Sequence, residues 1–268
     1  MKVRQLSFLL ILASKSLFAQ DINSGSRITS MGNTGVAIQD AWSLQSNPAG
    51  IAALHTPVMG VTYQKNFPGT SLSTESAIFV YPLKNHAFGL GIQSFGFSAY
   101  KELRLGFAYA RKFGESVYSA LNFNYHQLSI PAYGSTRTYS IDGGFQYRFS
   151  NELILGAHVS NLSNSSYDQT AGAVIPVYLA IGASYRFSEE LLLCTSLCAG
   201  NIDSGGDFRC GVEYCLLDQL ALRAGLAVHP FSQYAGFGYM LKHIHVDLAV
   251  NNHLVLGYNP QISLGYVF

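Results

Sequence analysis

The sequence predicts an all-β fold, a transmembrane antiparallel β-barrel of about fourteen strands. Three observations predict it. From residue 57 onward, the chain divides into extended segments in which apolar and polar side chains alternate. The connections between these segments alternate between short and long. The chain ends on an alternating segment that closes with an aromatic residue, Phe268.

The predicted strands are long, and many reach the length that a tilted strand needs to cross a bilayer. They cover residues 57–66, 74–83, 86–97, 102–113, 116–128, 137–149, 152–161, 175–187, 190–199, 207–216, 219–229, 233–241, 243–250 and 260–268.

Short and long connections strictly alternate in this division, and the short ones are Lys84-Asn85, Gly114-Glu115, Ser150-Asn151, Ser188-Glu189, Leu217-Asp218 and Lys242. Bacterial outer-membrane barrels have tight turns on the periplasmic rim and longer loops outside, so we expect both termini to be periplasmic.

Each predicted strand has one apolar and one polar face. In 102–113 the apolar face carries Leu103, Leu105, Phe107 and Tyr109, and the other face carries Glu102, Arg104, Gly106, Ala108 and Ala110. In a membrane barrel the apolar face contacts lipid and the polar face lines the lumen. In a soluble β-sandwich the apolar face would instead cover a core, so alternation alone leaves both folds open.

Composition supports the barrel. Charged residues make up 12% of the chain, while 26 glycines and 34 residues of Tyr and Phe (17 of each) are present. No run of apolar residues after the N-terminus is long enough for a membrane-spanning helix. The net charge of +1 gives no argument for a nucleic-acid partner.

The first residues predict a secretory signal peptide over residues 1–19. Lys2 and Arg4 precede the apolar stretch Leu6 to Leu12, and Ala19 is a small residue at the expected cleavage point. An N-terminal membrane anchor is the alternative, but Lys15 interrupts the end of the short apolar stretch.

The last strand, residues 260–268, places Ile262, Leu264, Tyr266 and Phe268 on one face. This pattern resembles the C-terminal signal that bacterial barrels present to their assembly machinery, with Phe268 as the recognised residue and Tyr266 as its aromatic companion. Pairing of this strand with 57–66 would close the barrel and leave no open edge in the lipid.

Residues 20–56 do not have the pattern of a strand pair. Gly32 and Gly35 permit tight turns, Asp40 is placed to cap a short helix over 41–45, and Pro48 ends that helix.

The segment resembles the start of FadL-type outer-membrane transporters and their PorV/PorQ relatives. The match consists of Met31, Gly32, Gly35-Val36-Ala37, Asp40 and Asn47-Pro48-Ala49-Gly50. The resemblance implies a fourteen-stranded barrel over 57–268, with residues 20–56 folded into the lumen as a hatch. It also implies an outer-membrane location in a Gram-negative bacterium, with Bacteroidota as the expected phylum.

Two functions follow from this resemblance. FadL-type proteins conduct hydrophobic compounds past the hatch to a lateral opening, so the first hypothesis is a conduit for hydrophobic or small compounds. PorV/PorQ relatives serve type IX secretion, so the second is a scaffold or cargo-shuttle barrel that binds secretion-system proteins. Outer-membrane lipid and the barrel assembly machinery are expected partners in both cases.

Charged residues on the predicted lumen side form the candidate site. They are Arg104, Asp142, Arg148, Arg186, Arg209, Glu213, Arg223, His245 and Asp247. One interpretation is a polar path or an anchoring surface for the hatch. The other, which we favour, is a mutually satisfied ion-pair network within the wall.

Other chemistry finds little support. His243 and His245 share a strand face, but no cysteine or carboxylate cluster accompanies them, so no metal site is predicted. The four cysteines, Cys194, Cys198, Cys210 and Cys215, fall in one predicted hairpin, where buried thiols and disulfides are both open. The sequence assembles no catalytic group and no cofactor motif, so we expect no enzyme activity.

Overall fold

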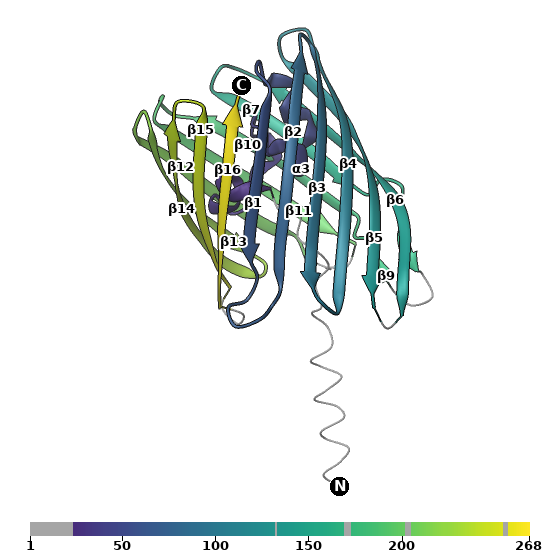
Figure 1. Ribbon diagram of the computed structural model, residues 1–268. Helices are drawn as coiled ribbons and strands as arrows, with labels where there is room; N and C mark the ends of the chain where they lie inside the picture. Colours follow the sequence, from purple (N-terminus) through teal and green to yellow (C-terminus); the bar gives the residue numbers. More distant parts are fainter. Residues whose placement is uncertain (1–23, 132, 169–172, 202–204, 254–256) are drawn as a thin grey trace.

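The computed structural model describes residues 24–131, 133–168, 173–201, 205–253 and 257–268. The predicted signal peptide lies outside the described residues. The chain forms a closed barrel of fourteen antiparallel strands. Four short helical turns lie inside it: α2 (Gly25–Ser30), η1 (Gly35–Ala37), α3 (Ser43–Ser46) and η2 (Pro48–Ala53) (Figure 1). The fold prediction is confirmed, and the closed barrel excludes the β-sandwich alternative.

The wall strands follow each other around the barrel in chain order. They are β1 (Val58–Lys65), β2 (Ser73–Leu83), β3 (His86–Phe97), β4 (Tyr100–Phe113), β5 (Val117–Ile130), β6 (Gly134–Arg148), β7 (Leu153–Ser160), β10 (Tyr178–Arg186), β11 (Leu191–Gly200), β12 (Asp207–Leu217), β13 (Leu220–Val228), β14 (Phe231–Leu241), β15 (Ile244–His253) and β16 (Gly257–Val267). The short strands β8 (Ser166–Asp168) and β9 (Ala173–Val174) pair with each other between β7 and β10.

The barrel closes where the sequence predicts. β1 pairs with β16 from Val58↔Val267 to Gln64↔Gln261, and the Phe268 amide donates to the Pro57 carbonyl at 3.0 Å. The start of β1 and the C-terminus therefore lie on the same rim. The Phe268 ring makes an edge contact with Tyr266, with ring centroids 5.0 Å apart.

The outer surface is apolar, as the alternation predicts. In β4, Leu105 and Phe107 are 41% and 49% exposed on the outside, whereas Arg104 and Ala108, on either side of them in the strand, are buried inside. Such a lipid-facing row cannot be covered by the protein itself and requires an apolar solvent. Among the described residues, no helix has both the length and the hydropathy of a membrane span.

The prediction that short and long connections strictly alternate is wrong. On the rim opposite the C-terminus, residues 98–99 alone join β3 to β4, and residues 229–230 join β13 to β14. The strands β4 to β6 continue into polar residues that the sequence pattern assigned to loops. Backbone pairing is indifferent to side-chain polarity once a strand leaves the hydrocarbon layer, so the loss of apolar alternation did not mark the strand ends.

Candidate functional site

The site is built by the hatch, which we define as residues 24–56. It contains α2 (Gly25–Ser30), η1 (Gly35–Ala37), α3 (Ser43–Ser46) and η2 (Pro48–Ala53). These are short turns of helix. Gly32, with φ of 72°, ends the turn after α2, and Asn47 takes an extended conformation ahead of Pro48 and ends α3. Almost all hatch residues from 24 to 52 are buried, although the segment is rich in Ser, Thr and Asn.

Asn47 holds the centre of the hatch against the wall. Its side chain is fully buried, and its amide Nδ2 donates to the carbonyls of Val36, Phe145 and Ala157 at 2.6, 3.1 and 3.3 Å. Its Oδ1 accepts from the Ala49 amide, which begins η2. Asn47 therefore joins two parts of the hatch to β6 and β7 through one side chain.

The predicted role of Asp40 as a helix cap is wrong in detail. The helix α3 begins at Ser43 with Trp42 at its N-cap, and the Asp40 carboxylate instead accepts from the Trp42 amide at 2.6 Å. This local bond leaves the other carboxylate oxygen free to bind Arg27 at 2.7 Å. The Asp40 side chain thus forms an ion pair and does not cap the helix α3.

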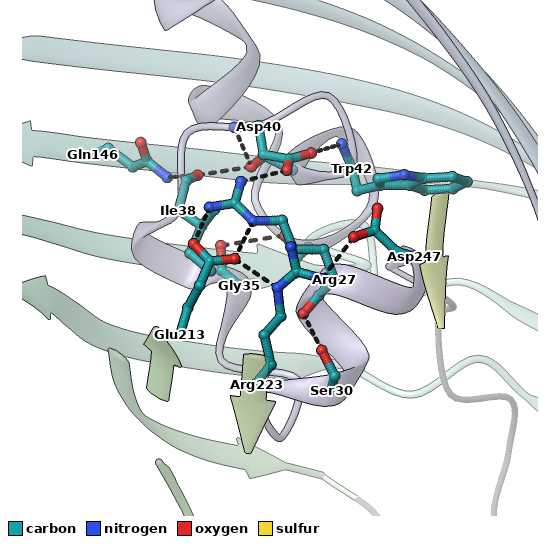
Figure 2. Close-up of polar contacts among 12 residues, drawn as sticks. Arg27, Ser30, Gly35, Ile38, Asp40, Trp42, Gln146, Glu213, Arg223 and Asp247 are labelled. Carbon is teal, nitrogen blue, oxygen red and sulfur yellow. Dashed lines mark hydrogen bonds and ion pairs between the residues drawn. The ribbon is translucent and has the colours of Figure 1, made fainter. Parts of the chain in front are cut away.

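Five charged residues connect the hatch to the wall, and we call them the latch: Arg27, Asp40, Glu213, Arg223 and Asp247. Figure 2 shows them meeting at the inner face of β12, β13 and β15. Arg27 contacts Asp40 and both Glu213 oxygens, at 2.7 and 2.9 Å for the latter. Arg223 contacts Glu213 and Asp247, each at 2.6 Å.

The latch is a chain of alternating charges. Burial opposes the charge of Arg27, but the carboxylates of Glu213 and Asp40 outweigh it, and the pKa of the guanidinium lies well above its ordinary value. Glu213 and Arg223 are both less than one-tenth exposed. Arg27 comes from the hatch and Glu213 from the wall, and each charge is costly to bury without a partner, so this ion pair ties the hatch to the wall.

A second polar group lies across the lumen on β4, β5 and β6. Arg104 contacts Asp142 at 2.8 Å, and Asn122 and Asn124 both donate to the same carboxylate. Asp142 also accepts from the Asn161 amide at 2.9 Å, just beyond the end of β7. This group lies within the wall and does not include a charged hatch residue.

The charged residues predicted to line the lumen therefore fall into separate groups. Arg223 and Asp247 join the latch, while Arg104 and Asp142 pair with each other. Arg148 reaches the hatch by donating to Gln39 Oε1 at 2.8 Å, whereas Arg186 is exposed and belongs to neither group.

Sequence reasoning missed Arg27 and Gln146. Gln146 is fully buried and donates to the carbonyls of Val36 and Ile38. Arg27 could have been found, because it is the one Arg or Lys in the segment 20–56, which is otherwise small, polar or apolar. A lone cation in a segment expected to fill a lumen needs carboxylate partners, and Asp40 in the same segment and Glu213 on the wall each supply one.

At the hatch motif residues, the backbone of the hatch packs closely against other backbone, both of the wall and of the hatch itself. Met31 is fully buried, and a Cβ added at the wall residue Gly211 would lie 2.2 Å from the Met31 carbonyl oxygen. At Gly225 an added Cβ would lie 2.3 Å from the Gly32 nitrogen. Within the hatch, a Cβ at Gly50 would lie 2.5 Å from the Ile38 carbonyl oxygen. The glycines of hatch and wall thus allow the two backbones to touch.

The wall has a seam between β6 and β7. β6 pairs with β5 along its whole length, but in the described residues its ladder with β7 runs only from Gly143 to Arg148. Beyond it, Asn161 adopts φ of 51° and the chain leaves the wall. The Asn161 side chain then holds the departing loop by donating to the carbonyls of Ser165 and Ile175.

The cysteines and the candidate metal ligands do not form a site among the described residues. The four cysteines are free, and Cys194 and Cys198 are buried on the lumen side. Within the part of the chain that the structure describes, no three His, Cys, Asp or Glu side chains are grouped as metal ligands.

Solved structures of outer-membrane channels share this fold. The toluene transporter TbuX of Ralstonia pickettii aligns over 91% of this chain and 98% of its own, with a TM-score of 0.71 and 14% identity. The monoaromatic hydrocarbon channel CymD aligns over 91% of this chain and 97% of its own, with a TM-score of 0.72 and 14% identity. A FadL homologue of Pseudomonas aeruginosa aligns over 91% of this chain and 98% of its own, with a TM-score of 0.65 and 12% identity.

At these identities the likeness shows the fold alone. The barrel is FadL-like, and its short N-terminal helical segment resembles the FadL hatch. No known family profile matches the sequence, and no curated protein does so either.

Proposed function

We propose that this FadL-like barrel lies in the outer membrane of a Gram-negative bacterium and conducts hydrophobic or small compounds when its hatch is displaced. One observation carries the proposal. In the described chain, no hatch residue takes part in the strand pairing of the wall, which closes on itself through β1 and β16. The hatch can therefore move without breaking the barrel, because only side-chain contacts and close packing hold it.

The surface under the hatch supports a hydrophobic cargo. On the lumen side of β2 to β5, the wall carries the buried apolar residues Ile78, Val80, Ala87, Ala108, Ala110 and Tyr118. The hatch covers them with Trp42, Leu44 and Ile51. Displacement of the hatch would expose this apolar lining to the lumen, and apolar lining favours an apolar guest.

The seam between β6 and β7 is the proposed lateral exit. A compound that leaves through it enters the lipid directly, because the outer surface near the seam is apolar, with Ile141 on β6 and Leu179 on β10, the next strand after β7, 40% and 45% exposed. Beyond Gly143↔Val159, one backbone hydrogen bond crosses the seam in the described chain, from the Leu162 amide to the Ile141 carbonyl at 2.7 Å, so little pairing has to break for the seam to open.

A reversible lock on the hatch tests the conduit. Ser26 in the hatch and Ser263 on β16 bring their Oγ atoms to 2.8 Å, so a disulfide fits between these positions. In the double variant Ser26→Cys/Ser263→Cys, we expect oxidation to abolish the uptake of radiolabelled toluene by cells that lack other channels for it. Reduction should restore the uptake to the level of the unmodified protein.

The single variant Ser26→Cys is the matched control and should transport under both conditions. Uptake that is equal in oxidised and reduced double variant, with the disulfide verified by mass spectrometry, would rule out passage that depends on the hatch.

A second candidate is a type IX secretion-associated scaffold or cargo-shuttle barrel without transport activity, as in PorV/PorQ relatives of Bacteroidota. The latch supports it, since buried ion pairs keep the lumen filled. This function predicts that the locked and unlocked double variant recover the same secretion-system proteins in a pull-down from the native membrane, and that neither form transports toluene.

A further inference from the structure

The hatch meets the wall at β3, β4 and β5 around a small cavity. Its volume is about 10 Å³ for the centre of a water molecule, and it is lined by Leu44 and Gln45 of the hatch and by Gly91, Arg104 and Asn122 of the wall. A cavity of this size holds one water molecule if polar partners surround it.

Three buried polar atoms belong to residues that line this cavity and have no partner among the described residues. They are Gln45 Oε1, Arg104 Nη1 and Asn122 Oδ1. The three residues are 7%, 7% and 3% exposed. An unpaired polar atom this deeply buried is costly, and native proteins rarely leave one without a partner.

The orientation of both amides is fixed by their other contacts. Gln45 Nε2 donates to Ser76 Oγ at 2.7 Å, and the Ser76 hydroxyl itself donates to the Ile92 carbonyl. Asn122 Nδ2 donates to Asn124 Oδ1 and to Asp142 Oδ2, which are both acceptors. The two amide oxygens, and not their nitrogens, are therefore left over for the cavity.

These three atoms thus offer the cavity two acceptors and one donor. A chloride or other anion would be repelled by the two carbonyl oxygens, and a cation would be repelled by the Arg104 guanidinium. A neutral molecule that donates twice and accepts once matches all three atoms, and within this volume that molecule is water.

We propose that Gln45, Arg104 and Asn122 form a binding site for one buried water molecule, which bridges the hatch to the wall. The hatch is then held on one side by the ion pair of Arg27 with Glu213 on β12, and on the other side by this water together with the direct bond of Gln45 to Ser76. On the side of β2 to β5, the hatch can move by exchanging neutral hydrogen bonds and without separating charges. This inference does not depend on what the barrel conducts.

A high-resolution crystal structure of the full chain tests the site directly. We expect one ordered water within hydrogen-bonding distance of Gln45 Oε1, Arg104 Nη1 and Asn122 Oδ1. A dry cavity, or direct protein partners for these atoms in its place, would overturn the proposal.

A variant gives an independent test. A Cβ added at Gly91 meets nothing closer than 3.7 Å, so Gly91→Ala fits without strain but narrows the cavity. The water is then expelled and three polar atoms lose their partner, so the barrel should unfold at a lower temperature on a detergent gel. Gly265→Ala, whose added Cβ meets nothing closer than 3.5 Å and lines no part of this cavity, is the control and should not lower it. Equal unfolding temperatures for the two variants would contradict a bound water.

Discussion

Replacing Glu213 with Gln is expected to release the hatch and to destabilise the protein by about 3 kcal/mol, because one change removes the carboxylate that Arg27 and Arg223 share. Gln has nearly the same shape, so the loss comes from charge and not from packing. Urea unfolding in detergent measures the free energy. Trypsin cleavage after Arg27, followed by mass spectrometry, reports directly on the hatch and should become much faster.

Glu115→Gln is the matched control for this variant. Glu115 is almost fully exposed and lies 3.6 Å from Lys112, in an ion pair that solvent screens. We expect it to change neither the unfolding nor the cleavage at Arg27. If Glu213→Gln were cleaved as slowly as the unmodified protein, the latch would not hold the hatch.

Replacing Gly225 with Ala is expected to open the lumen while leaving the wall intact. The added Cβ would lie 2.3 Å from the Gly32 nitrogen and 2.4 Å from the Met31 carbonyl carbon, so the hatch backbone cannot keep its position. The three atoms nearest to the added Cβ all belong to Met31 and Gly32 of the hatch, so strand pairing is unaffected. In planar bilayers the variant should conduct steadily, and on a detergent gel it should still shift on heating, as a folded barrel does.

Gly265→Ala again serves as the control, since its Cβ would make only ordinary contacts and should leave the barrel closed. A Gly225→Ala variant that stays as closed as the control would mean that contact between the two backbones does not seat the hatch.

The fold was predictable because it depends on local alternation. Every predicted strand exists, since each side chain of a membrane strand must face either lipid or lumen, and that choice is visible residue by residue. Connection lengths were predicted less well. Polar residues such as Ser135 and Thr136 still pair within β6, ahead of residue 137, where the sequence predicted this strand to begin.

The site was predictable only in part. The inward direction of Arg104, Arg223 and Asp247 follows from alternation, and the structure places them inside. Which charged side chains meet depends on the register of the strands around the closed barrel and on the position of the hatch in the lumen. Neither can be predicted from the sequence of a single segment. The contact of Arg27 with Glu213 spans 186 positions of the chain, and no local pattern reports a pairing at that separation.

The central claim is that the hatch, and no part of the wall, blocks the lumen of this barrel. Single-channel recording in planar bilayers tests it most directly, by comparing the intact protein with a variant that lacks residues 24–53. The structure predicts no steady current through the intact protein and stepwise, long-lived conductance through the shortened one. Equal behaviour of the two proteins, whether both conduct or both stay silent, would contradict the claim.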